Sequence, residues 1–249
     1  MSDPASNTYL LFQLYGPMAS WGDVAMGEVR PTFDHPSKSA VLGMIGAALG
    51  IRQSEEEKHR ALAQTYRFAV RLDVPGRLLR DYHTSTAPRG KRARGLPTRR
   101  DELDYPKKTT IESYRDYRCD ARATVCVWTQ DPEPRWSLPE IREALEAPEF
   151  TLYLGRKACP PALPLNPTVV TGETLREAFE ASGHSDDPFT KKLTEDVETV
   201  RLYWEEGGQS GFDVDQVQTR RDQPVSRNRW TFEDRREKYV ALSRDQDTA

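Results

Sequence analysis

The sequence predicts an α+β protein whose strands and helices follow the order β-α-β-β-α-β before a smaller β-rich region. Residues 8–15 are apolar on both faces of a strand, and residues 66–74 repeat apolar side chains at every second position. Two helical patterns with capping signals, which begin near Ser37 and at Ser137, separate the strands. This order is that of a split βαβ domain, also described as ferredoxin-like or RRM-like.

The first strand ends at a Gly-Pro pair, and a loop leads to a helix from about residue 37 to residue 49. Gly43 and Gly46 share one face of this helix, where they would let it approach the sheet closely. A second helical pattern covers residues 55–64, directly ahead of the next strand.

After the strand at 66–74, a Pro-Gly turn predicts that residues 77–85 return as the second strand of a hairpin. A basic segment then interrupts the order until a strand at 119–130. A capping box with proline in the first turn predicts the helix at Ser137. Residues 151–156 are expected to form the last short strand of this domain.

A proline-rich connector at 160–167 separates this domain, residues 8–165, from a small β-rich domain, residues 168–249. A short helix is expected at 174–181, and a Gly-Gly pair at 207–208 indicates a hairpin. The strand patterns of this region lie at 197–205, 212–219, 229–232 and 239–242.

Composition excludes several classes of protein. The chain has 249 residues, of which 37% are hydrophobic and 9% aromatic, enough for a core and incompatible with disorder throughout. The longest apolar stretch, residues 40–51, is shorter than the roughly 20 residues of a membrane span. The first ten residues lack the pattern of a secretory signal. Three cysteines and four histidines without metal-ligand spacing lead us to expect reduced thiols, a cytoplasmic location, no metal and no cofactor.

Charge is distributed unevenly along the chain. Between residues 89 and 108 there are eight cations and three acids, a local charge of +5, whereas the whole chain carries −3 and the remainder therefore −8. A basic, Gly- and Pro-rich segment on an acidic body is a candidate contact for a polyanion. The alternative is a solvated flexible loop.

Catalytic motifs are scarce. Strand alternation would place His83 beside Asp81, and His83 with Tyr82 could act on a scissile RNA phosphate. A hydrogen-bonded structural histidine is the alternative. The motifs of serine hydrolases, zinc proteases, P-loop proteins and dinucleotide-binding proteins do not occur. We therefore predict no catalytic residue.

Nucleic-acid binding has more support, although the aromatic RNP1 pattern of RNA-recognition modules is missing, so loops would hold the RNA. A helix start with hydroxyls and a lysine is one candidate phosphate site. The candidate RNA contacts are Trp21, Arg30, Ser37, Lys38, Ser39, Arg80, Tyr82, His83, Arg89, Lys91, Arg92, Arg94, Arg99, Arg100, Lys107, Lys108, Tyr153, Arg156 and Lys157.

Several motifs occur together and in order, which makes them more specific than any one of them. They lie at 16–22 (GPMASWG), 30–32 (RPT), 36–51, 68–71, 79–84 (LRDYHT), 117–121 and 153–160. This set resembles the Cas5 family, in the form that serves the type I-E CRISPR surveillance complex, Cascade. The resemblance covers about residues 8–165 closely and the remainder loosely.

The resemblance implies a ferredoxin-like palm with an inserted thumb at about residues 86–112, the segment that charge alone singles out. It also implies a non-catalytic subunit that holds the 5′ handle of the guide RNA (crRNA) and caps the complex backbone. The expected protein partners are the backbone subunit CasC and the large subunit CasA. Target DNA would be contacted only as part of the complex, and no membrane is expected as a partner.

Two other functions stay open at this point. A Cas5 relative in another CRISPR subtype trims repeat RNA, so a metal-independent endoribonuclease using His83 and Tyr82 is one alternative. A free-standing binder of single-stranded RNA outside CRISPR is the other.

Overall fold

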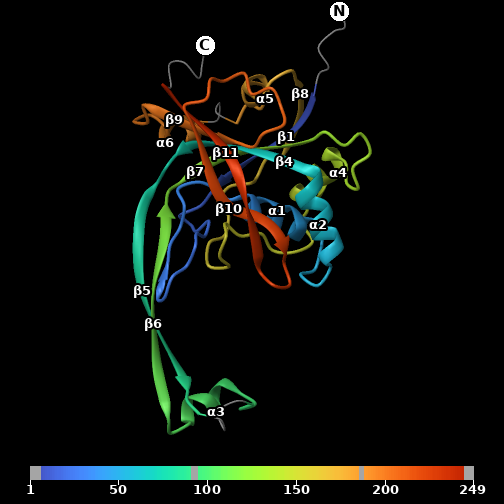
Figure 1. Cartoon of the computed structure of the whole chain (residues 1–249). Helices are drawn as coiled ribbons and strands as arrows, with labels where there is room; N and C mark the ends of the chain where they lie inside the picture. Colours follow the sequence, from blue (N-terminus) through green and yellow to red (C-terminus); the bar gives the residue numbers. More distant parts are fainter. Residues whose placement is uncertain (1–6, 91–94, 185–187, 244–249) are drawn as a thin grey trace, which may run out of the picture.

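Two sheets organise the chain: a seven-stranded sheet that carries the core and a smaller sheet that carries a projecting arm (Figure 1). The computed structural model describes residues 7–90, 95–184 and 188–243. Within those ranges, no helix is both long enough and apolar enough to cross a membrane. The chain is thus a mixed α/β protein with mainly antiparallel sheets, as the sequence predicts.

Neighbouring strands of the large sheet all run antiparallel. Their order is β10 (Gln216–Ser226), β11 (Thr231–Ser243), β9 (Thr199–Trp204), β4 (Tyr66–Val74), β7 (Arg122–Thr129), β1 (Asn7–Tyr15) and β8 (Thr168–Gly172). The C-terminal strands join this sheet through the pairing of β9 with β4, so hydrogen bonding is continuous across the sheet. The division into two domains near residue 165 stays a prediction.

Helices cover both faces of the large sheet. One face packs against α1 (Lys38–Ala48), α2 (Glu56–Thr65) and α4 (Leu138–Glu146), and the other against α5 (Leu175–Ala181). A further short helix, α6 (Pro188–Leu193), follows α5. The predicted helix starts are confirmed: Ser37 caps α1, and Ser137 and Glu140 form the capping box of α4.

Strand β1 illustrates why the N-terminal stretch carries apolar side chains on both of its faces. Leu10, Phe12 and Leu14 pack with α1, α2 and α4, whereas Tyr9 and Leu11 pack on the opposite face with α5. A strand that is covered on both faces is a nearly continuous apolar run. The predicted first strand is therefore confirmed.

The strand expected at 77–85 exists as β5 (Arg77–Pro88), but the expected hairpin with β4 is wrong. β4 already has β7 and β9 as neighbours, so it offers no free edge. β5 pairs instead with β6 (Lys108–Cys119). Gly76 permits this departure, since its φ is +64° and a Cβ there would lie 2.5 Å from the carbonyl oxygen of Cys119.

The expected strand at 151–156 is also wrong, because these residues form a loop and the strand that follows α4 is β8. Gly155 has a φ of +84°, and a Cβ on it would lie 1.8 Å from the carbonyl oxygen of Ser20. The amide of Ser20 donates to the carbonyl oxygen of Leu154 at 3.0 Å. The loop is thus held against residues 20–21, away from any sheet edge.

Three smaller expectations also change. The strand expected at 119–130 is divided at Asp120, which has a φ of 55°, into β6 and β7. The C-terminal hairpin joins β10 to β11, while β9 pairs with β4 and β11. The α1 glycines do not face the sheet, since a Cβ on Gly43 would meet Arg227 and one on Gly46 would meet His59 of α2.

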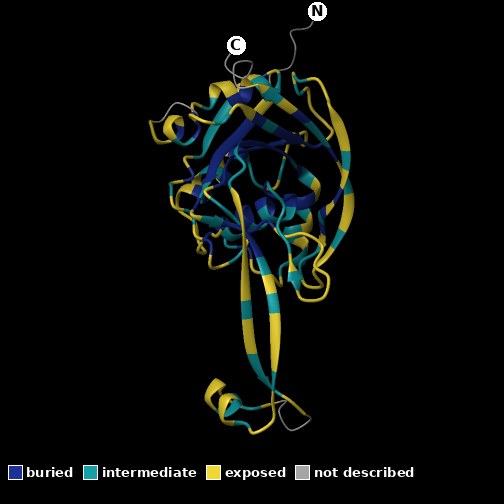
Figure 2. Cartoon of the chain, turned by 90° about the vertical axis from the view of Figure 1, so that its left-hand side faces the viewer, coloured by how far each residue is buried: buried dark blue, intermediate teal, exposed yellow. Residues whose placement is uncertain are grey.

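The arm, residues 77–119, leaves the body as a two-stranded ribbon (Figures 1 and 2). β5 and β6 pair without a register shift from Arg77 opposite Cys119 to Pro88 opposite Lys108. Two short strands, β2 (Met18–Ala19) and β3 (Val29–Arg30), pair with β6 near the body, and helix α3 (Arg99–Asp104) lies at the far end. The basic segment predicted from charge therefore occupies the outer part of the arm.

Candidate nucleic-acid interface

A cleft of about 930 Å³ lies over α1, between the loop 150–157 and the turn 227–230 that joins β10 to β11. We call it the α1 cleft. Its lining includes five aromatic side chains, four Arg or Lys side chains and one histidine. These are Trp21, Phe150, Tyr153, Trp230 and Phe232, then Arg52, Arg156, Lys157 and Arg227, and His59. None of the lining residues is acidic, although the chain as a whole carries 39 Asp and Glu residues.

The floor of the α1 cleft is open because α1 presents small side chains to it. Ser39, Ala40, Gly43 and Ala47 line the cleft, and a Cβ on Gly43 would lie 3.0 Å from Nη2 of Arg227. The Arg227 guanidinium donates from that nitrogen to the carbonyl oxygen of Ser39. Gly43 thus leaves the space in which the β10–β11 turn rests on the helix.

The opposite wall connects the cleft with the base of the arm. Arg156 donates to the carbonyl oxygens of Asp116 at 3.2 Å and Arg30 at 3.1 Å. Its guanidinium carbon also lies 4.7 Å from the centre of the Tyr117 ring. Because Asp116 and Tyr117 belong to β6, a ligand in the cleft would lie next to the arm.

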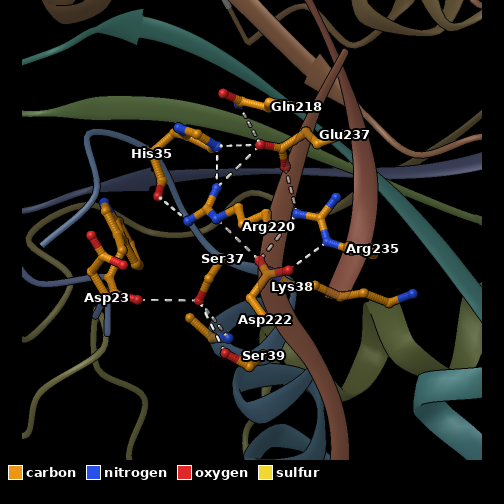
Figure 3. Close-up of polar contacts among 12 residues, drawn as sticks. Asp23, His35, Ser37, Lys38, Ser39, Gln218, Arg220, Asp222, Arg235 and Glu237 are labelled. Atoms are coloured by element: carbon orange, nitrogen blue, oxygen red, sulfur yellow. Dashed lines mark hydrogen bonds and ion pairs between the residues drawn. The ribbon is translucent and has the colours of Figure 1, made fainter. Parts of the chain in front are cut away.

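A buried ionic network holds the start of α1 against the C-terminal strands (Figure 3). We call it the α1 network. Its members are His35, Lys38, Glu205, Arg220, Asp222, Arg235 and Glu237. The Lys38 ammonium lies 2.9 Å from a Glu205 oxygen, and the Lys38 backbone amide donates to Asp222 at 2.8 Å. The network therefore fixes both the floor of the cleft and the hairpin that walls it.

Two carboxylates of this region bind the His35 side chain. Asp34 lies 2.7 Å from Nδ1 of His35 and Glu237 lies 3.1 Å from Nε2, while the imidazole stacks on Tyr203 with ring centres 3.6 Å apart. Burial alone would raise the pKa of Asp34 and Glu237, but hydrogen bonds with His35 and nearby arginine charges lower both pKa values well below the usual range.

This electrostatic arrangement predicts loss of stability in acid. The folded-state pKa of Asp34 lies below its unfolded value of about 3.9, so its contribution is present above that value and is lost as pH falls below it. The free energy of unfolding, measured by denaturant titration, should therefore decrease from about pH 5 towards pH 2. Asp34→Asn should flatten that dependence, whereas Asp213→Asn, at an exposed carboxylate, should leave it unchanged. Equal pH profiles for all three proteins would contradict the assignment.

Six of the RNA contacts predicted from the sequence come together in the α1 cleft. They are Trp21, Ser37, Ser39, Tyr153, Arg156 and Lys157. The expectation for Lys38 needs correction: only 2% of Lys38 is exposed, and its ammonium is paired with Glu205. A lysine in the α1 network cannot also neutralise a phosphate in solvent, so Lys38 leaves the candidate set.

The other predicted contacts lie on or beside the arm. Arg30 is at its base, Arg80, Tyr82 and His83 are on β5, and Arg89, Arg99, Arg100, Lys107 and Lys108 are in its outer part. Lys91, Arg92 and Arg94 lie outside the described residues. Two of these arginines form ion pairs within the chain, because Arg80 pairs with Asp116 at 2.7 Å and Arg99 with Glu102 at 2.6 Å.

His83 and Tyr82 occupy opposite faces of β5. His83 lies 2.6 Å from Asp81 on one face, and Tyr82 faces Tyr114 on the other with ring centres 5.4 Å apart. The two side chains therefore do not converge on one phosphate. Elsewhere in the described part of the chain, no three His, Cys, Asp or Glu side chains gather as metal ligands.

The sequence analysis does not predict the cleft residues that come from the α1–α2 loop, from α2, from the β10–β11 turn and from the start of β11. These are Arg52, His59, Arg227, Trp230 and Phe232. The sequence analysis expects a strand at 229–232, whereas the structure has Arg229 and Trp230 in the turn before β11, which begins at Thr231. The basic and aromatic side chains of this turn are therefore not predicted as a group, and neither is the position of the turn beside α1.

Comparisons with known proteins identify a family and one curated relative. The family described as CRISPR-associated protein (Cas_Cas5) matches residues 9–237. A curated relative, the CRISPR system Cascade subunit CasD of Escherichia coli (strain K12), is 37% identical over 168 residues, which are 64% of this chain and 69% of the relative.

Two solved structures share the fold. A chain of a structure titled CRISPR RNA-guided surveillance complex is 27% identical, with a TM-score of 0.61, covering 96% of this chain and 90% of its own length. A second structure, titled Crystal structure of Cas protein, is 23% identical with a TM-score of 0.58, and 96% of each chain is covered. The matched regions thus cover nearly the whole of this chain in both comparisons.

Proposed function

The chain belongs to the Cas5 family of CRISPR-associated proteins, and from this we propose that it is the guide-RNA-binding subunit of a Cascade-type surveillance complex. Its role would be to hold the 5′ handle of the crRNA and to cap one end of the backbone in antiviral defence. The observation that carries the proposal is the composition of the α1 cleft, which is aromatic and basic without an acidic side chain.

Single-stranded RNA fits this composition because it repeats two chemical groups. Each nucleotide offers a negatively charged phosphate, which cations bind, and a base with a flat π-face, on which aromatic rings stack. Arg52, Arg156, Lys157 and Arg227 form no ion pair with a carboxylate in the described ranges, and Arg156 and Arg227 are held by carbonyl oxygens. Their positive charge therefore stays available to an anionic ligand.

The arm supports the proposed contacts with the neighbouring subunits CasC and CasA. Leu78, Tyr82 and Ile111 are each at least 50% exposed on a ribbon that projects away from the core. Apolar side chains in such positions stabilise a complex only when a partner covers them. We assign the arm to the thumb that the family resemblance implies.

The strand order supports a ferredoxin-like palm. β1 and β4 run on either side of antiparallel β7, with α1 in the connection between them, and β8 follows α4 on the other side of β1. A split βαβ domain would have this strand order, so the order supports the proposal. A non-catalytic role fits the geometry of β5, where His83 and Tyr82 point to opposite faces. The endoribonuclease alternative would need them together.

The salt dependence of RNA binding tests the proposed cleft. If Arg156 and Lys157 each neutralise one phosphate, the double variant Arg156→Ala/Lys157→Ala should reduce the slope of log K against log salt by about 1.4, since each phosphate contributes about 0.7 for single strands. Affinity for guide RNA would be measured between about 50 and 200 mM salt. The variant Lys192→Ala/Arg236→Ala makes the same change in net charge at exposed positions outside the cleft lining.

The control pair should leave the slope unchanged. If the cleft variant bound guide RNA with the parental slope of log K against log salt, the RNA would not pass through the cleft. Parallel losses in the cleft and control variants would indicate a general charge effect and would also contradict the proposal.

A further inference from the structure

Trp230 at the tip of the β10–β11 hairpin has no role that the fold explains. Its side chain is 61% exposed and belongs to neither hydrophobic core cluster. Its φ is 52°, in the left-handed region that Gly or Asn adopts with least strain and a bulky residue with most. The left-handed backbone and the solvent exposure of this position would therefore both suit a smaller polar residue better than tryptophan. Residues with strained backbones of this kind concentrate at ligand sites.

The turn that carries Trp230 is held in place from several sides. Gln53 donates to the carbonyl oxygen of Arg227 at 3.1 Å, and the amide of Asn228 donates to Glu56 at 3.2 Å. The Arg227 guanidinium donates to Ser39 on α1, and its carbon lies 6.0 Å from the centre of the Trp230 ring. The ring is therefore presented at the α1 cleft by a fixed turn.

We propose that Trp230 is a stacking platform for one unpaired base of an RNA strand that lies in the α1 cleft. This inference rests on the proposed function and adds to it the residue that receives a base. The cleft cations bind the phosphates on either side, while the exposed indole supplies the flat apolar surface that a base covers.

The charge of the cleft favours RNA over a peptide as the occupant. A peptide would have to be strongly acidic to match four cations without a carboxylate, whereas RNA brings one negative charge with each base. The lining combines aromatic and basic side chains, the two kinds of group that a base and a phosphate bind. An acidic peptide is the alternative that the experiment below tests as well.

A double-mutant cycle between protein and RNA tests the stacking directly. The guide RNA is made with one abasic nucleotide, which is moved through each position of its repeat-derived 5′ segment, and its affinity for the full chain in the assembled complex is measured. At one position, loss of the base should weaken binding by about 5- to 150-fold, the range for one base–aromatic stack. Trp230→Ala should weaken binding of intact RNA by the same factor and leave the abasic RNA unaffected, since the pair is already broken.

Two further variants separate stacking from a structural role. Trp230→Phe keeps an aromatic face and should retain most of the affinity. Trp230→Asn suits the left-handed backbone, so its melting temperature should equal or exceed that of the parent while its RNA affinity falls. If Trp230 had a structural role alone, Trp230→Asn would lower the melting temperature and leave RNA affinity unchanged. Phe189→Ala removes a 42% exposed aromatic outside the cleft lining and should leave RNA affinity unchanged, while loss of its contact with Tyr15, at 5.0 Å between ring centres, lowers the melting temperature slightly.

The possible failures can be told apart. If no RNA position couples to Trp230 while Arg156→Ala/Lys157→Ala still weakens guide binding, the stacking proposal is wrong and the proposed function stands. If neither set of variants affects guide binding, both are wrong. If a poly-glutamate peptide competes with the guide RNA for the parent but not for Trp230→Ala, the site prefers an acidic peptide and the stacking proposal is overturned.

Discussion

Replacing Arg235 by leucine should lower the free energy of unfolding by about 3–5 kcal/mol, the cost of leaving buried charges without their partner. The Arg235 side chain is 8% exposed and lies 2.5 Å from both Asp222 and Glu237. Leucine would keep apolar contact with Phe68, whose ring centre is 4.9 Å from the guanidinium carbon. Urea denaturation at neutral pH measures the loss.

The next residue provides a matched control. Arg236 lies on the same strand, is 65% exposed, and is 3.5 Å from Glu206. Arg236→Leu should change the free energy of unfolding by less than about 1 kcal/mol, because exposed ion pairs contribute little. Similar small losses in both variants would contradict a stabilising role for the α1 network. Because this network holds the walls of the α1 cleft together, Arg235→Leu should also weaken guide RNA binding.

Removal of the outer arm should abolish assembly while leaving the body folded. Tyr82 and Tyr114 are directly opposite each other, so an Asn-Gly turn can join them in place of residues 83–113. The described residues among those deleted are exposed or half-buried and none of them belongs to a core cluster, so the melting temperature should stay close to that of the parent. We expect at least a tenfold loss of the chain from complexes purified with guide RNA and the partner subunits, since about 1.4 kcal/mol of lost contact suffices.

A shorter deletion shows which part of the arm is needed. Joining Pro88 to Lys108 by the same turn removes residues 89–107 but keeps the ribbon with its exposed apolar side chains. Assembly that survives this change assigns the contact to the ribbon, and assembly that fails assigns it to the outer part of the arm. Normal incorporation of the version without residues 83–113 would contradict the thumb assignment.

Local patterns predict most of the long helices and strands of this fold but not which strands pair. β1, α1 and β4 follow from apolar periodicity and from the Ser37 cap, which are properties of neighbouring residues. Strand pairing depends on which edges are free after the whole sheet has formed. The Pro-Gly turn predicts that β5 pairs with β4. However, β9, which lies more than a hundred residues later in the chain, occupies that edge of β4.

The candidate site shows the same difference between what local sequence predicts and what long-range contacts decide. Tyr153, Arg156 and Lys157 were found because they are close together in the sequence and form one loop. Arg227 and Trp230 were missed because they reach the cleft only when the β10–β11 hairpin rests on α1, through contacts between residues 39 and 227. Lys38 was misassigned because its partner, Glu205, is equally distant in the sequence.

The central claim is that the guide RNA passes through the α1 cleft, and photo-crosslinking within the assembled complex tests it most directly. Guide RNA with a single 4-thiouridine at successive positions of its 5′ segment would be irradiated, and the modified peptides would be identified by mass spectrometry. We predict adducts at consecutive positions on peptides that contain Tyr153 and Trp230, which line opposite walls of the cleft. Adducts confined to the arm, or none on this chain while other subunits are labelled, would contradict the account.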